Sequence, residues 1–115
     1  NLKSEYLGGA ISPGIDIRYK SLHHYTSKLP KLIKSEVHNL IGTSTSEAIH
    51  SGVINGVIHE IKGIIRQYEL DYHDLTVVLT GGDTKFLFKQ LKNSIFANQN
   101  FLLHGLNKIL TFNNQ

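Results

Sequence analysis

The chain has 115 residues, of which 40% are hydrophobic and 18% are charged, and its formal net charge is +3. This length suits one domain of ordinary globular composition. The absence of cysteine excludes disulfide bonds and thiolate chemistry. The lysines and arginines are dispersed along the chain, which argues against a nucleic-acid partner. No apolar run approaches the roughly 20 residues that span a membrane.

Residues 5–11 read as a short strand that leads into a turn rich in glycine and proline: Gly8, Gly9, Pro13 and Gly14. Such a turn bends sharply or lets another group approach the backbone closely. Because the chain opens on Asn1 and enters a strand almost at once, we expect it to come from inside a longer protein. We also expect partner strands of its sheet to lie upstream.

Residues 15–29 are predicted to form a helix that Pro30 ends, because a helical stripe falls at Ile15, Tyr19, Leu22, Thr26 and Leu29. Residues 31–41 then form a connector that is apolar enough to lie against the body of the domain.

The longest periodic segment covers residues 48–68, where apolar residues recur at helical spacing: Ile49, Val53, Val57, Ile61, Ile64, Ile65 and Tyr68. This spacing predicts a helix in spite of the many β-branched residues. Ser44 and Glu47 fit a capping box, in which the serine hydroxyl accepts the N–H of Glu47 and the carboxylate accepts the N–H of Ser44.

Gly52, Gly56 and Gly63 lie inside this predicted helix, and each costs about 1 kcal/mol relative to alanine. The glycines favour a tight helix crossing on their face. Alternatively, the first turn of the helix lies on a ligand, since its free N–H groups and positive dipole end favour an anion.

Residues 75–80 read as a buried strand that ends in Gly81 and Gly82, after which Asp83 is predicted to cap a short helix. Residues 93–101 return as a loop or an edge strand, and residues 103–112 are predicted to form a final helix. Strands that alternate with helices indicate an α/β fold with a thin sheet.

No arrangement of catalytic side chains stands out in the sequence. The spacing of the seven histidines argues against a metal site, and His50 and His59, nine residues apart, point to opposite faces of the predicted helix. Neither a phosphate loop, nor a dinucleotide fingerprint, nor a nucleophile elbow is present. Three turns remain, at residues 8–14, 42–47 and 80–84. We expect them to converge on one crevice, a binding site without a visible base.

Taken together, these turns resemble the type III pantothenate kinase family. Residues 8–14 are similar to its Gly-Gly-Ala-Ile-x-Pro-Gly signature, and residues 29–30 to the Leu-Pro that ends its next helix. Residues 41–52 resemble its Ile-Gly-x-x-Thr-x-x-Ala-x-x-x-Gly segment, and residues 80–82 its Thr-Gly-Gly strand end. Leu103, Gly105, Leu106 and Asn113 match its closing pattern, so the resemblance covers nearly the whole chain.

The resemblance implies that residues 1–115 are the C-terminal ribonuclease-H-like domain, of the actin-like ATPase type, of a two-domain kinase. The family's N-terminal half is absent from the sequence. The phosphate-binding Asp-x-Gly-Asn-Thr, the proton-accepting aspartate and the aspartate that holds a monovalent cation would all lie upstream of Asn1. No catalytic or metal-binding residue is therefore expected in this chain, which alone should not phosphorylate pantothenate.

A few site residues carry over from the family. Thr45 matches its substrate-binding threonine, and Gly81 and Gly82 match the turn near the adenosine end of the nucleotide. The loop with Gly8, Gly9 and Gly14 matches a loop near the cleft. Thr43 stands where many members carry Lys or Arg, so a charged contact at that position is in doubt.

The implied activity is ATP-dependent phosphorylation of pantothenate to 4'-phosphopantothenate, the first step of coenzyme A synthesis. The family implies Mg²⁺, a monovalent cation (K⁺ or NH₄⁺), a cytoplasmic location and a homodimer, for which the glycine-rich helix is the candidate contact. Two alternatives stay open: another small-molecule kinase of the same superfamily, such as a sugar kinase, and a non-catalytic dimerisation or transcription-accessory module.

Overall fold

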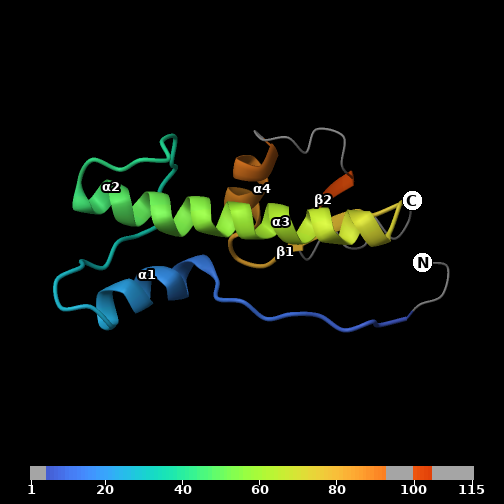
Figure 1. The fold of residues 1–115 in the computed structure, drawn as a ribbon, viewed down its shortest axis with the longest axis horizontal. Helices are drawn as coiled ribbons and strands as arrows, with labels where there is room; N and C mark the ends of the chain where they lie inside the picture. The colour runs from blue at the N-terminus through green and yellow to red at the C-terminus, as the bar shows by residue number, and fades with distance from the viewer. Residues whose placement is uncertain (1–4, 93–99, 105–115) are drawn as a thin grey trace.

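A computed structural model describes residues 5–92 and 100–104 of the chain. Its elements are α1 (Ile15–His24), α2 (Thr45–His50), the π-helix η1 (Ser51–Asn55), α3 (Gly56–Asp71), β1 (Thr76–Thr80), α4 (Thr84–Lys92) and β2 (Asn100–His104). Figure 1 shows α2, η1 and α3 as one continuous long helix, with α1 alongside it and α4 across its middle. None of the helices in this described part is long and apolar enough to cross a membrane.

The predicted long helix is confirmed, and its apolar stripe forms most of the core. The buried members are Ile49, Val53, Ile54, Val57, Ile58 and Ile65, which are joined in the core by Ile15 and Tyr19 of α1 and by Leu91 of α4. Ile64 and Tyr68, which the periodicity also placed on the stripe, are 44% and 46% exposed. The helix therefore carries its apolar pattern beyond the described elements that pack on it.

The π-helix η1 was not predicted from the sequence. Single π-helical turns inside α-helices occur frequently at functional sites. Here, side chains of the turn form hydrogen bonds with the preceding connector. Ser51 Oγ donates to the carbonyl of Leu40, and Asn55 Nδ2 donates to the carbonyl of Asn39 at 3.3 Å. The connector is thus fastened to the long helix by hydrogen bonds from the helix side chains.

The predicted tight crossing at the helix glycines is wrong for the described part of the chain. A Cβ built at Gly52, Gly56 or Gly63 would meet nothing within 4 Å. Gly52 and Gly56 instead line a hollow of about 420 Å³ together with Leu40, Gly42, Ala48, Ser51, Asn55 and His59.

The helix α1 ends at His24, earlier than the predicted Leu29. Beyond that point, side chains of the segment contact nearby backbone carbonyls. Thr26 Oγ1 donates to the carbonyl of Leu22, and His23 Nδ1 lies 2.8 Å from the carbonyl of Leu29. Such local side-chain bonds compete with helix continuation, so Pro30 is not what ends the helix.

The described sheet has two parallel strands, β1 and β2, in the register Thr76↔Asn100 to Thr80↔His104. The described part of the chain is thus mostly helical with a small parallel sheet, and α4 lies in the crossover that parallel strands need. The predicted strand at 75–80 agrees with β1. Of the predicted return at 93–101, residues 100 and 101 belong to β2 and residues 93–99 lie outside the described residues, whereas Leu103 and His104 belong to β2 and do not begin a helix. The rest of the predicted final helix, residues 105–112, lies outside the described residues.

Residues 5–11 do not form the predicted strand. They are irregular and exposed, and neither β1 nor β2 pairs with them. A strand needs a partner for its backbone groups, and no described strand supplies one here.

Candidate functional site

The long helix begins at a turn built from hydroxyl side chains. Ser44 has extended backbone angles, and its Oγ accepts a hydrogen bond from the N–H of Glu47 at 3.1 Å, as predicted for the first half of a capping box. The carboxylate of Glu47, however, accepts from the N–H of Thr43 at 3.2 Å and from its hydroxyl at 3.1 Å, and not from the N–H of Ser44. These bonds hold the pKa of Glu47 below its usual value.

Thr45 is the first residue of α2 and is exposed. Among residues 5–92 and 100–104, no side chain or backbone group forms a hydrogen bond with its hydroxyl. The capping turn on either side therefore fixes the backbone of Thr45 while its side chain stays open to solvent.

A hollow of about 250 Å³ lies between the connector and the first turns of the long helix. Its lining residues are Ser35, Glu36, Val37, His38, Asn39, Ile41, Gly42, Glu47 and His50. Tyr19 of α1 holds the ring of His50 in place, because His50 Nδ1 lies 2.6 Å from the hydroxyl of Tyr19 and the two rings meet edge to face. Tyr19 is only 1% exposed, and this burial raises the pKa of its phenol.

The turn after β1 is open on its outer side. Gly81 has a φ of 109°, a conformation that side chains other than glycine rarely adopt, and a Cβ at Gly81 or Gly82 would meet nothing within 4 Å. Thr84 closes the turn from inside, where its N–H donates to the carbonyl of Gly81 at 3.3 Å. Gly81 and Gly82 are exposed, although the carbonyl of Gly81 is taken by Thr84.

The carboxylate of Asp83, predicted to cap α4, accepts instead from Lys34 Nζ at 2.6 Å, and none of its described bonds reaches a backbone N–H of that helix. Lys34 Nζ also lies 5.4 Å from the centre of the Phe86 ring, and Lys89 pairs with Glu36. The connector is therefore bound to the glycine turn and α4 by charged side chains whose partners lie far apart in the sequence.

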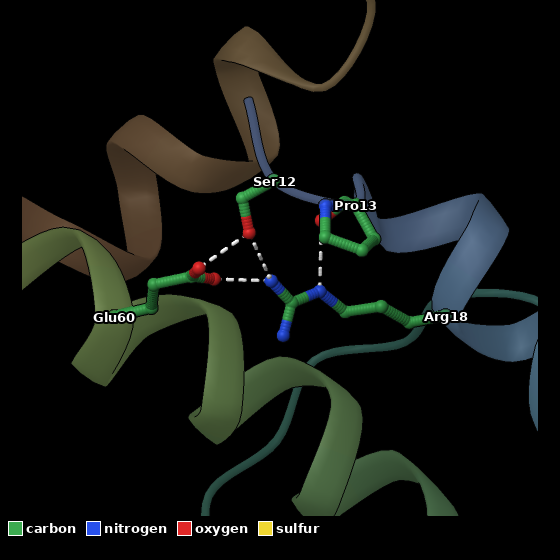
Figure 2. Close-up of polar contacts among 4 residues, drawn as sticks. All are labelled: Ser12, Pro13, Arg18 and Glu60. Carbon is green, nitrogen blue, oxygen red and sulfur yellow. Dashed lines mark hydrogen bonds and ion pairs between the residues drawn. The ribbon is translucent and has the colours of Figure 1, made fainter. Parts of the chain in front are cut away.

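The 8–14 loop is held by a cluster of polar side chains, shown in Figure 2. Arg18 of α1 donates from Nε to the carbonyl of Pro13 at 2.8 Å and from Nη2 to Ser12 Oγ at 3.2 Å. The same Nη2 pairs with Glu60 of α3, whose other carboxylate oxygen accepts from the hydroxyl of Ser12. The bond from Ser12 and the charge of Arg18 lower the pKa of Glu60.

The three turns do not meet in one crevice within the described part of a single chain. Thr45 lies at one end of the long helix, whereas α4, which follows the glycine turn, crosses its middle (Figure 1). Glu60, which holds the 8–14 loop, lies about 22 Å from Thr45 along the axis, at about 1.5 Å per residue. The cluster residues Arg18 and Glu60 carry no sequence signal, because 42 positions separate them.

The described residues contain no group of three or more histidine, cysteine, aspartate or glutamate side chains that could hold a metal ion. His50 contacts Tyr19, and His59 lines the hollow beside Gly56.

Comparison with known proteins identifies the family. A model described as type III pantothenate kinase matches residues 1–67, more than half of the chain. A type III pantothenate kinase of Flavobacterium johnsoniae is 54% identical over 90% of this chain, and one of Christiangramia forsetii is 54% identical over 98% of it. One of Cytophaga hutchinsonii is 46% identical over 98% of the chain. The chain therefore belongs to the type III pantothenate kinase family, as the motifs predicted.

The aligned segment covers only part of each relative: 42% of the Flavobacterium protein and 48% of the Christiangramia and Cytophaga proteins. The chain thus spans a little under half the length of the relatives that it matches.

Proposed function

We propose that this chain is the C-terminal, ribonuclease-H-like part of an ATP-dependent pantothenate kinase, a transferase that makes 4'-phosphopantothenate in the cytoplasm. The observation that carries the proposal is the 54% identity over 98% of the chain to a protein named type III pantothenate kinase. The open hydroxyl at the start of the long helix and the open glycine turn after β1 are consistent with an acceptor site and a nucleotide site.

Thr45 is the proposed pantothenate-binding residue of this chain. Its hydroxyl can donate to and accept from the hydroxyl or amide groups of pantothenate. The support is its position in the first turn of α2, where the bonds of Ser44 and Glu47 fix the backbone and leave the side chain exposed. An exposed hydroxyl on a rigid turn can bind a ligand with little loss of conformational freedom.

Gly81 and Gly82 are proposed to approach the adenosine end of ATP. In support, a nucleotide can come close to this backbone, because no side chain of the turn stands in its way. The loop with Gly8, Gly9 and Gly14 is proposed to border the same cleft.

The reaction class also needs Mg²⁺, and the family's monovalent cation, to offset charge on the transferred phosphoryl group. The family resemblance supports ion sites and catalytic aspartates in the part of the kinase outside this chain, and we assign no catalytic step to the residues of this chain.

A homodimer is part of the proposal. About 22 Å of helix separates Thr45 from the residue that holds the 8–14 loop. If Thr45 and that loop serve one site, a second copy of the chain must supply one of them. The hollow beside Gly52 and Gly56 offers a surface for such a contact.

The test is ADP release by the full-length kinase that contains these residues, with Mg-ATP and a panel of acceptors, with and without K⁺. The proposal predicts turnover that requires pantothenate and increases with K⁺, and no turnover by the 115-residue chain alone. Turnover with a sugar and none with pantothenate would overturn it in favour of another kinase of the superfamily. A folded protein that releases no ADP with any acceptor of the panel would favour the non-catalytic role.

A further inference from the structure

The 8–14 loop is not held in place by apolar burial. All residues from 5 to 14 are exposed, and Ile11, the largest apolar side chain of the loop, lies fully in solvent. Gly8 has a φ of 119°, so the loop also contains a left-handed backbone position without a packed neighbour. The position of the loop therefore depends on its polar contacts.

Those contacts converge on two side chains, Arg18 and Glu60. The planar guanidinium of Arg18 reaches a backbone carbonyl, a hydroxyl and a carboxylate at once, a geometry that a single ammonium does not offer. One carboxylate oxygen of Glu60 accepts from Arg18, and the other accepts from the hydroxyl of Ser12 (Figure 2). The side chains of Arg18 and Glu60 are only 24% and 33% exposed, so water screens the pair less than it screens an open surface pair.

Both side chains stand on rigid elements. Arg18 lies between Ile15 and Tyr19, the two buried residues of α1, and Glu60 lies one turn after the buried Val57 of α3. The first residue of α1, Ile15, belongs to the same core as Leu91 of α4. The loop is thus fastened to the core that includes α4, and Glu60, its anchor on the long helix, lies about 22 Å from Thr45 along the axis.

We propose that Arg18 and Glu60 are positioning residues that hold the 8–14 loop in register with the nucleotide side of the cleft. The assignment of that cleft rests on the proposed kinase function. The geometry makes Arg18 the centre of the arrangement, because it is the one side chain of the described residues that contacts the loop backbone, the loop hydroxyl and the long helix. Loss of Arg18 frees the loop and weakens ATP binding, while pantothenate binding at Thr45 stays unchanged.

The test compares Arg18→Met with Lys20→Met in the full-length kinase. Lys20 is a matched control, because it lies on the same helix and pairs with Asp16 in an exposed salt bridge that does not touch the loop. Thermolysin cleavage of the folded protein before Ile11 should accelerate about tenfold in Arg18→Met, because the loop loses roughly one charge-assisted hydrogen bond that restrains it. The KM for ATP should rise by a similar factor, whereas kcat and the KM for pantothenate should change less than about twofold. Lys20→Met should match the wild type in every measurement.

The outcomes separate this inference from the proposed function. An unchanged rate of cleavage before Ile11 would overturn the role of Arg18 whether or not the protein phosphorylates pantothenate. Faster cleavage without a rise in the KM for ATP would refute the link to the nucleotide. If the wild type has no kinase activity, the cleavage rate still decides whether Arg18 holds the loop. Full recovery in Arg18→Lys would also contradict the proposal, because it would mean that charge alone suffices and the forked geometry does not matter.

Discussion

Gly42 precedes the long helix, and Gly63 lies inside it. A side chain would have opposite effects on stability at these two positions. A Cβ at Gly42 would lie 2.3 Å from the backbone nitrogen of Ala48, whereas a Cβ at Gly63 would meet nothing within 4 Å. We expect Gly42→Ala to lower the free energy of unfolding by about 1–3 kcal/mol, because the backbone at the start of α2 must shift. Gly63→Ala should raise it by up to about 1 kcal/mol through helix propensity.

Urea denaturation of the two variants beside the wild type measures both effects. A Gly42→Ala variant as stable as Gly63→Ala would show that the turn before α2 has room for a side chain. It would also remove the reason for a glycine at the start of the proposed acceptor site.

At the scale of elements, the contact between the 8–14 loop and α3 should depend on pH through Glu60. The bond from Ser12 and the charge of Arg18 place the folded-state pKa of Glu60 below the unfolded value of about 4.3. Its stabilisation is therefore fully present above that value and is lost as pH falls through the folded-state pKa. We expect the wild type to be more stable than Glu60→Gln at neutral pH and this difference to shrink below about pH 4.3.

Thermal denaturation of both proteins over a pH series checks this prediction. Asp16→Asn is the control for a carboxylate in an exposed pair on α1. The opposite outcome is a stability difference between the wild type and Glu60→Gln that stays constant down to acidic pH. That result would mean that the carboxylate charge contributes nothing to the contact.

The elements that the sequence predicted well are those whose signal is local. The spacing of apolar residues predicted the long helix, and Ser44 at its start is the N-cap that the sequence indicated. The features that sequence reasoning missed depend on distant or competing contacts. Helix α1 ends early because Thr26 and His23 bind nearby carbonyls, and η1 accompanies bonds from Ser51 and Asn55 to the connector.

The candidate site shows the same division. Sequence motifs gave Thr45, Gly81 and Gly82 as site residues, and the structure leaves all three accessible. Arg18 and Glu60 could not be found from the sequence, because their contact joins residues 42 positions apart. Nor could periodicity show that the faces of Gly52 and Gly56 lack a neighbour within the described part of the chain.

At the scale of the whole molecule, the open face at Gly56 predicts a contact between two copies. Nothing lies within 4 Å of a Cβ at Gly56, so the fold of one chain should accept a larger residue there. We expect Gly56→Leu to leave the far-UV circular dichroism unchanged and to weaken the proposed dimer of the full-length protein about tenfold or more, as filling a close interface does.

Light scattering over a concentration series measures this change, and Gly63→Leu is the control, because Gly63 does not line the hollow beside Gly56. A mass that Gly56→Leu leaves unchanged at all concentrations would place the contact between copies elsewhere.

The measurement that tests the central claim most directly is pantothenate-dependent ADP release by the full-length protein, with Thr45→Val and Thr45→Ser beside the wild type. Loss of the hydroxyl in Thr45→Val should raise the KM for pantothenate about tenfold, since roughly one ligand hydrogen bond is lost, and Thr45→Ser should stay close to the wild type. This result would establish both the activity and the role of the long helix in binding the acceptor. A wild-type protein that binds ATP but does not turn over pantothenate, or a Thr45→Val variant with an unchanged KM, would contradict the account.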